Sequence, residues 1–236
     1  MNLQIRKFDI TNTKKHCIIL IIGAGSDKRQ LVRDIMYHKR DISTGTVIVP
    51  REDDKDFYSE YINATCIHSE YDTSIIKHVL TQQKEMAKLL QHEKIHLKIP
   101  TINPAAFLIL DNSENEEIND EIMKYAYMNN RHFYLSIILS QENVPEITSL
   151  IRVNIDYVFI FQDSNIVNMR NIYKQFAGIF SSFEDFYAVM NQCTKENFEC
   201  LVIDNTINSK NLEDKILWYK AESHAAFQVC NPLQYI

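Results

Sequence analysis

Glycine is scarce in this chain. Only four glycines occur among 236 residues, at positions 23, 25, 45 and 178, whereas average usage is about 7%. Two glycines close together therefore need a structural reason, and Gly23 and Gly25 are such a pair. Proline occurs five times, and because no Pro/Gly-rich linker divides the chain, we expect one domain over residues 1–236.

Long apolar runs are also absent. The run Cys17–Ile22 is far too short to span a bilayer, and the N-terminus lacks the apolar core of a signal peptide. The five cysteines are odd in number and scattered without metal-site spacing, which indicates a reducing compartment. We expect a protein that is neither secreted nor embedded in a membrane.

Positive charge is in deficit. Lysine and arginine total 25 against 31 aspartates and glutamates, a net charge of −6. This balance argues against a free-standing module that grips duplex DNA over a broad basic face, but it leaves a local basic rim open.

Short apolar runs alternate with longer segments of helical period, which predicts an α/β fold: a mostly parallel sheet with helices on both faces. The predicted strands are Cys17–Ile22, Thr46–Val49, Phe107–Leu110, Tyr134–Leu139, Tyr157–Phe161 and Glu199–Ile203. The predicted helices are Leu31–Tyr37, Ser74–Leu90, Ile118–Met128, Val144–Ile151, Asn165–Phe176 and Phe183–Met190.

Two segments fall outside this alternation. Residues 91–104 are largely polar and carry Pro100 and Pro104, which predicts a surface loop. Residues 215–236 form a C-terminal tail, in which 215–220 is suited to an edge strand.

The glycine pair follows the first predicted strand and precedes a helix. Gly23, Gly25, Ser26 and Lys28 occupy a strand–loop–helix connection, where backbone N–H groups and a lysine can cradle a polyphosphate. The match to a phosphate loop is incomplete. Asp27 stands where a glycine belongs, Arg29 stands where the magnesium-binding hydroxyl belongs, and Gly23 lies one residue too close to Lys28. The alternative is a strand-to-helix turn whose glycines serve tight geometry.

Asp111 stands at the end of another apolar strand. In nucleotide hydrolases, the aspartate that holds the ligand shell of magnesium stands at the same position. The following position, where an acid would assist proton transfer, is Asn112, although Glu114 lies nearby. Equally, Asp111 suits a turn or a helix cap.

Two more polar residues lie at strand or helix ends. Gln141 follows the predicted strand at 134–139 and is suited either to sensing a γ-phosphate or to satisfying a loop. Arg152 is suited either to pairing with Asp156 or to reaching a neighbouring subunit as an arginine finger.

Together these residues resemble the genome-packaging ATPases of nucleocytoplasmic large DNA viruses, the poxvirus and giant-virus branch of the FtsK–HerA superfamily. The resemblance covers nearly the whole chain. It is strongest at 31–38, 46–50, 57–58, 69–72, 107–111, 130–132, 140–141, 152–159, 183–186, 190–194 and 200–206.

The resemblance implies a RecA-like P-loop NTPase core that binds ATP and Mg²⁺ and couples hydrolysis to DNA translocation. It further implies a homo-oligomeric ring, or a hetero-oligomer with an active paralogue, that meets double-stranded DNA and capsid proteins in the host cytoplasm (a viral factory) or the virion. Residue by residue, Lys28 matches the phosphate-loop lysine, Asp111 the magnesium-linked aspartate, Gln141 the sensor and Arg152 the trans-acting arginine.

The departures from the family pattern fall on chemical positions, namely Asp27, Arg29 and Asn112. We therefore expect a packaging-ATPase homologue with impaired or lost hydrolysis and a structural or regulatory role. The alternative is an active ATP-driven translocase with a non-standard phosphate loop. A nucleotide kinase is a third class, but the chain shows no arginine-rich lid.

Overall fold

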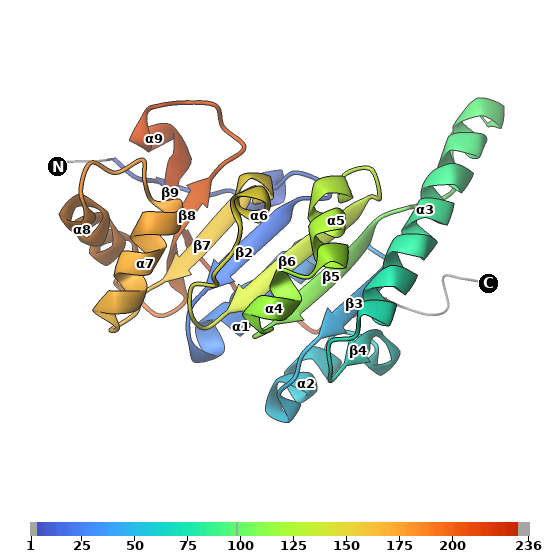
Figure 1. Ribbon diagram of the computed structural model, residues 1–236, viewed down its shortest axis with the longest axis horizontal. Helices are drawn as coiled ribbons and strands as arrows, with labels where there is room; N and C mark the ends of the chain where they lie inside the picture. The colour runs from blue at the N-terminus through green and yellow to red at the C-terminus, as the bar shows by residue number, and fades with distance from the viewer. Residues whose placement is uncertain (1–3, 98, 231–236) are drawn as a thin grey trace.

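The computed structural model describes residues 4–97 and 99–230, and these form one nine-stranded sheet in the order β1-β9-β8-β7-β2-β6-β5-β3-β4 (Figure 1). The strands are β1 (Arg6–Lys7), β2 (Ile18–Ile22), β3 (Thr44–Ile48), β4 (Ile67–His68), β5 (Ala106–Asp111), β6 (Leu135–Gln141), β7 (Tyr157–Phe161), β8 (Glu199–Asp204) and β9 (Ile216–Lys220).

The sheet is mostly parallel, as predicted. The six strands from β7 to β4 in this order pair in parallel. β8 instead runs antiparallel to both of its neighbours. α7 and α8 lie between β7 and β8, and the chain enters β8 from the opposite end of the sheet.

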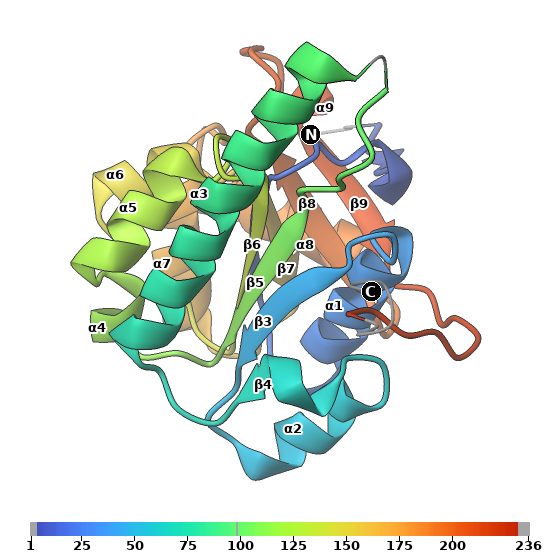
Figure 2. The same cartoon turned by 90° about the vertical axis from the view of Figure 1, so that its right-hand side faces the viewer.

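Helices cover both faces of the sheet, with α1 and α2 on one side and α3 to α6 on the other (Figure 2). The helices are α1 (Gly25–His38), α2 (Glu52–Ser59), α3 (Thr73–His96), α4 (Asn115–Ile118), α5 (Glu121–Asn129), α6 (Ser149–Asn154), α7 (Ile166–Phe176), α8 (Phe183–Cys193) and α9 (Leu212–Lys215). Alternation along β2 separates two cores: Leu20 packs with α3 to α8, whereas Ile19 and Ile21 pack with α1.

Two predicted helices have different bounds in the structure. The segment 144–151 is helical only from Ser149, because Pro145 restricts the residue before it and supplies no backbone N–H. The segment 118–128 is divided between α4 and α5, since the side chain of Asp120 accepts a hydrogen bond from the backbone N–H of Ile122 and starts a new helix.

The expected loop at 91–104 is also partly wrong. α3 continues through His96, since no glycine or proline interrupts 91–96. The Glu93 carboxylate then accepts hydrogen bonds from the backbone N–H groups of Thr101 and Ile102, which ties the following turn to the helix.

The C-terminal tail forms a strand, but not at the edge of the sheet. β9 lies between β8 and the short strand β1, so β1 is the edge strand. The segment after β9 crosses to α1 and α2, where the backbone N–H of Val229 donates to the carbonyl of Tyr61 at 2.9 Å. Residues 231–236 of the predicted tail lie outside the described residues.

Candidate functional site

The predicted site residues other than Arg152 gather at the carboxyl ends of three neighbouring strands. β6 lies between β2 and β5, with Ile22 opposite Gln141 and Ser140 opposite Asp111. The backbone N–H of Gly23 donates to the carbonyl of Gln141 at 3.0 Å, and that of Asn112 donates to Ser140 at 2.8 Å. The strand order therefore places the glycine turn, Gln141 and Asp111 at one edge of the sheet, where open α/β sheets bind ligands.

Lys28 is buried in an ion pair with Asp111. Its Nζ lies 2.5 Å from Asp111 Oδ1 and 2.9 Å from Asn112 Oδ1. Lys28 is 1% exposed and Asp111 is fully buried. The ammonium group therefore already has an anionic partner inside the protein.

Tyr58 completes the surroundings of Asp111. Its hydroxyl donates to Asp111 Oδ2 at 2.9 Å. Burial, and then the nearby negative charge of Asp111, raise the pKa of Tyr58 well above its usual value, so the hydroxyl stays protonated as a donor. Both carboxylate oxygens of Asp111 thus have a partner from a side chain.

The connection before Lys28 is short. β2 ends at Ile22 and α1 begins at Gly25, so that Lys28 lies at the end of the first helical turn. A phosphate loop needs four residues between its leading glycine and the glycine before the lysine. Only Gly23 and Ala24 lie between β2 and α1 here, and the segment from Gly23 to Asp27 is one residue shorter than the motif requires.

Each glycine of the pair has a structural reason of its own. A Cβ on Gly23 would lie 2.7 Å from the Cβ of Phe161. Gly25 has a φ of +63°, in the left-handed region that other residues rarely adopt. This geometry matches the interpretation of the pair as a tight strand-to-helix turn.

Arg29 has a charged partner on α2, and Asp27 lies in the first turn of α1. Arg29 Nη1 lies 2.6 Å from Asp54 Oδ1 on α2. Asp27 stands in the first turn of α1, whose N-cap, Ala24, makes no side-chain capping bond. A carboxylate there interacts favourably with the helix dipole, so Asp27 supplies the negative charge that a bound phosphate would otherwise bring. Ser26 is exposed and contacts the Asp27 carboxylate at 3.4 Å.

The residues present do not fit a magnesium ion in this arrangement. Mg²⁺ requires oxygen ligands in octahedral geometry, commonly a carboxylate together with waters and phosphate. Asp111 is fully buried with both oxygens engaged, and Arg29 has no oxygen to offer.

A pocket of about 490 Å³ opens beside this cluster. Arg51, Asn112, Glu114, Gln141 and Glu142 are among its lining residues, and Arg51 Nη1 pairs with Glu142 at 2.8 Å. Within the described residues, three buried side-chain atoms here have no hydrogen-bond partner, namely Asn112 Nδ2, Ser113 Oγ and Gln141 Nε2. Two amide donors without acceptors make this the strongest candidate for a bound anionic or carbonyl-bearing ligand.

Arg152 is not brought to this cluster. It lies on α6, which precedes the start of β7, so it is at the opposite end of that strand (Figure 1). The expected pairing with Asp156 is wrong: Arg152 donates to the carbonyl of Ile147, and Asp156 Oδ1 instead pairs with Arg131 at 2.6 Å. Asp156 Oδ2 accepts from the backbone of Ile18, which leaves no room for a second arginine.

Tyr58, Arg51 and Asp54 were not foreseen as members of the site, because α2 was not predicted. Tyr58 does lie in one of the stretches that carry the family resemblance, and that was the only available signal. An acidic segment such as Glu52–Ser59 has no apolar period that would mark it as a helix.

The fold and the position of the site define a class. The genome packaging NTPase B204 of Sulfolobus turreted icosahedral virus 2, in complex with AMPPCP, superimposes with a TM-score of 0.53 at 17% identity, covering 88% of this chain and 99% of that one. The pCW3 conjugation coupling protein TcpA with ATPγS gives a TM-score of 0.57 at 14% identity, covering 97% of this chain and 64% of that one. The chain has the α/β fold of the RecA-like P-loop ATPases.

Sequence comparison gives the narrower relationship. The uncharacterized protein L437 of Acanthamoeba polyphaga mimivirus is 35% identical over 209 residues, or 86% of this chain and 72% of that protein. The uncharacterized protein 075L of Invertebrate iridescent virus 6 is 35% identical over 223 residues, or 93% of this chain and 80% of that protein. The chain belongs to the family of these viral proteins.

No family model matches the chain. Among residues 4–97 and 99–230, no helix has both the length and the hydrophobicity needed to cross a bilayer.

Proposed function

We propose that this chain is a viral DNA-packaging ATPase homologue that has lost ATP hydrolysis and acts as a structural or regulatory subunit in virion assembly. Its expected assembly is a ring of its own copies or a hetero-oligomer with an active paralogue, in contact with double-stranded DNA and capsid proteins. Its expected location is the viral factory in the host cytoplasm or the virion. The fold, which is similar to that of a viral genome packaging NTPase, supports the packaging role, the viral relatives support a role in a virus, and the candidate site supports the loss of hydrolysis.

One observation carries the loss of hydrolysis: the ammonium of Lys28 is buried at 2.5 Å from Asp111. To reach a phosphate, Lys28 would have to leave a carboxylate that is fully buried and has no solvent to replace it. Leaving one partner of a buried pair alone costs about 3–5 kcal/mol. A nucleotide must supply this free energy before any contact of its own contributes to affinity.

The loop length strengthens this reasoning. Restoring residue types with Asp27→Gly, Arg29→Ser and Asn112→Glu leaves the two-residue connection between β2 and α1 unchanged. We therefore expect no hydrolysis from this triple variant. Inserting residues between Ala24 and Gly25 in the same variant is the change that lengthens the connection between β2 and α1.

The test is a titration of the purified chain with ATP, with and without Mg²⁺, together with ATP turnover in the presence and absence of duplex DNA. We expect no turnover above that of Lys28→Arg, a variant that retains the charge opposite Asp111. Magnesium-dependent turnover that DNA stimulates, and that Lys28→Arg abolishes, would overturn the proposal.

An active translocase with a non-standard phosphate loop is the second candidate, and the pocket favours it. Gln141 is buried and its Nε2 donor has no acceptor among the described residues. If a nucleotide binds there, Gln141→Leu weakens ATP binding. Under the main proposal, the same variant has no effect on nucleotide.

A further inference from the structure

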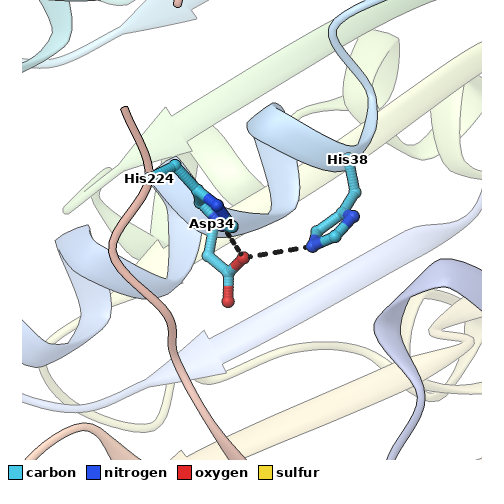
Figure 3. A group of neighbouring side chains, drawn as sticks. All are labelled: Asp34, His38 and His224. Carbon is cyan, nitrogen blue, oxygen red and sulfur yellow. Dashed lines mark hydrogen bonds and ion pairs between the residues drawn. The ribbon is translucent and has the colours of Figure 1, made fainter. Parts of the chain in front are cut away.

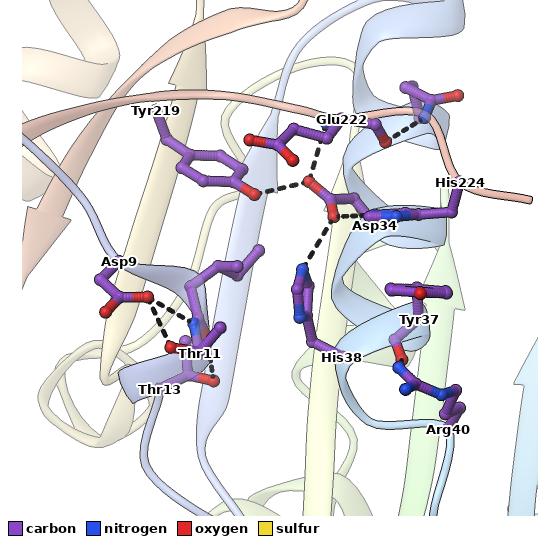
Figure 4. A network of polar contacts seen from close by, with 12 residues as sticks. Asp9, Thr11, Thr13, Asp34, Tyr37, His38, Arg40, Tyr219, Glu222 and His224 are labelled. Atoms are coloured by element: carbon purple, nitrogen blue, oxygen red, sulfur yellow. Dashed lines mark hydrogen bonds and ion pairs between the residues drawn. The ribbon is translucent and has the colours of Figure 1, made fainter.

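A second buried carboxylate lies further along α1, at Asp34. The first turn of α1 holds Lys28, and six residues later Asp34 projects from the same helix toward the segment that follows β9 (Figure 4). Asp34 is fully buried. Two imidazoles converge on it: His38, one turn later on α1, and His224, from the other end of the chain (Figure 3).

We propose that Asp34, His38 and His224 form a binding site for a divalent transition-metal ion, best matched to Zn²⁺, that fastens the segment after β9 to α1. One ligand atom from each of these residues lies within 4.8 Å of the others. Two imidazole nitrogens and one carboxylate oxygen form a ligand set of the kind that zinc sites with an open position use.

The helical spacing brings two of the ligands together. Asp34 and His38 are four residues apart and therefore lie on one face of α1. His38 Nε2 lies 3.4 Å from Asp34 Oδ1. Ligand bonds of about 2.0–2.1 Å in a tetrahedron place neighbouring donors about 3.3 Å apart, so this pair already has the separation that a shared ion requires.

The third ligand has to move slightly. His224 Nε2 lies 2.5 Å from Asp34 Oδ1, the distance of a short hydrogen bond. Without an ion, this contact is a hydrogen bond in which an imidazole N–H donates to the carboxylate oxygen. Metal binding replaces this proton and requires the two atoms to separate by less than about 1 Å, which a side-chain rotation of His224 supplies.

The surrounding groups hold the ligands in place. Asp34 Oδ2 accepts hydrogen bonds from the hydroxyl of Tyr219 at 2.7 Å and the backbone N–H of Glu222 at 2.9 Å. These bonds fix the carboxylate and leave Oδ1 for the ion, as outer contacts do in metal sites. The ring of Tyr37 stacks on His224 with centroids 3.7 Å apart and the two planes 5° apart.

Space for a further ligand is available beside His38. A pocket of about 350 Å³ is lined by His38, Asp9, Tyr219 and Glu222, among others. Water in this pocket can complete the coordination of the ion, since three protein ligands leave an open position. The exposed side of the site thus also gives the ion a path of entry.

The test uses the full chain after treatment with a chelator, titrated with Zn²⁺, and with Co²⁺ as a spectroscopic probe. We expect one ion per chain, a tetrahedral Co²⁺ absorption band, and a rise in melting temperature with Zn²⁺, because the ion binds the native state. His38→Gln and His224→Gln each remove the band and reduce Zn²⁺ affinity at least tenfold, the effect of losing one ligand.

The chain offers two matched controls. His92 and His96 are also four residues apart, on α3, with ring centroids at 4.3 Å, so the double variant His92→Gln/His96→Gln must leave the ion bound. The second control is Cys66→Ser, at a thiol that contacts the thiol of Cys230. This variant must also leave the ion bound. The proposal fails if Zn²⁺ does not bind. It also fails if His38→Gln and His224→Gln still bind Zn²⁺ and, without metal, have the melting temperature of the metal-free wild type.

Discussion

Two buried carboxylates lie along α1, and different side chains face them. Asp111 beside the first turn and Asp34 further along are both fully buried carboxylates. Each accepts a hydrogen bond from a tyrosine hydroxyl, Tyr58 at 2.9 Å and Tyr219 at 2.7 Å. The first carboxylate is neutralised by a lysine, whereas the second faces two imidazoles.

The difference decides what each site is able to bind. A lysine side chain offers only donors and no metal-binding lone pair, and the Lys28 Nζ already contacts the Asp111 carboxylate at 2.5 Å, so under our proposal this pair leaves no free group for a phosphate or a cation. Imidazoles have lone pairs when neutral, and they are metal ligands as well as hydrogen-bond donors. The cluster of Asp34, His38 and His224 therefore remains open to a cation.

The largest expected effect is at the Lys28–Asp111 pair. Lys28→Ala leaves Asp111 as an unpaired buried charge, and we expect a loss of about 3–5 kcal/mol in the free energy of unfolding. Urea denaturation followed by circular dichroism measures it. Lys55→Ala, which breaks a pair with the 82% exposed Glu52 side chain, is the control and is expected to cost less than about 1 kcal/mol. If Lys28→Ala lowers the free energy of unfolding no more than the control does, Lys28 does not stabilise the buried Asp111 carboxylate.

Removing the two tyrosine hydroxyls compares the sites directly. Tyr58→Phe and Tyr219→Phe each delete a hydrogen bond to a buried carboxylate, and we expect each to cost about 1.5–3 kcal/mol. Tyr127→Phe is the matched control, because the Tyr127 hydroxyl is buried and has no hydrogen-bond partner among the described residues. If Tyr127→Phe costs as much as the other two, the carboxylate bonds are not the cause.

Alkaline pH is expected to lower the free energy of unfolding through Tyr58 and Tyr219. Burial is the main reason that the pKa values of Tyr58 and Tyr219 are raised in the folded chain, whereas in the unfolded chain tyrosine ionises near pH 10. Their contribution to stability is thus complete below pH 10 and decreases above it, by up to about 1.4 kcal/mol per pH unit for each tyrosine. Denaturation at pH 9, 10 and 11 measures the slope. Tyr58→Phe should flatten it, and an unchanged slope would contradict the raised pKa.

The smallest effect is expected at Arg29. Its pair with the buried Asp54 is partly exposed on the arginine side, at 28%, and Arg51 stays beside Asp54 at 3.8 Å when Arg29 is removed, so Arg29→Ala should cost about 1 kcal/mol or less. We also expect no gain in ATP binding, because Lys28 stays paired with Asp111. An ATP-dependent rise in the melting temperature of Arg29→Ala would show that the arginine, not the buried lysine, keeps nucleotide out.

Much of the architecture was predictable because strands buried on both faces need continuous apolar runs. The runs ending near Ile22, Leu110 and Leu139 became β2, β5 and β6, and their shared edge brought Gly23, Asp111 and Gln141 together. Predictions failed where a single residue that breaks or caps a helix outweighed the apolar period, as at Pro145 and Asp120. The acidic helix α2 was missed because it shows no such period, and Tyr58 was missed as a site residue with it.

The amino-acid sequence by itself determined the alternation of the central strands with helices and the residue types that depart from the phosphate-loop pattern, because both are local properties of the chain. Only the tertiary structure decided the partners of the charged groups. Lys28 meets Asp111 across 83 residues, and Asp34 meets His224 across 190. Such pairs form because packing on α1 removes both groups from water, and a buried charge must then find its partner within the fold.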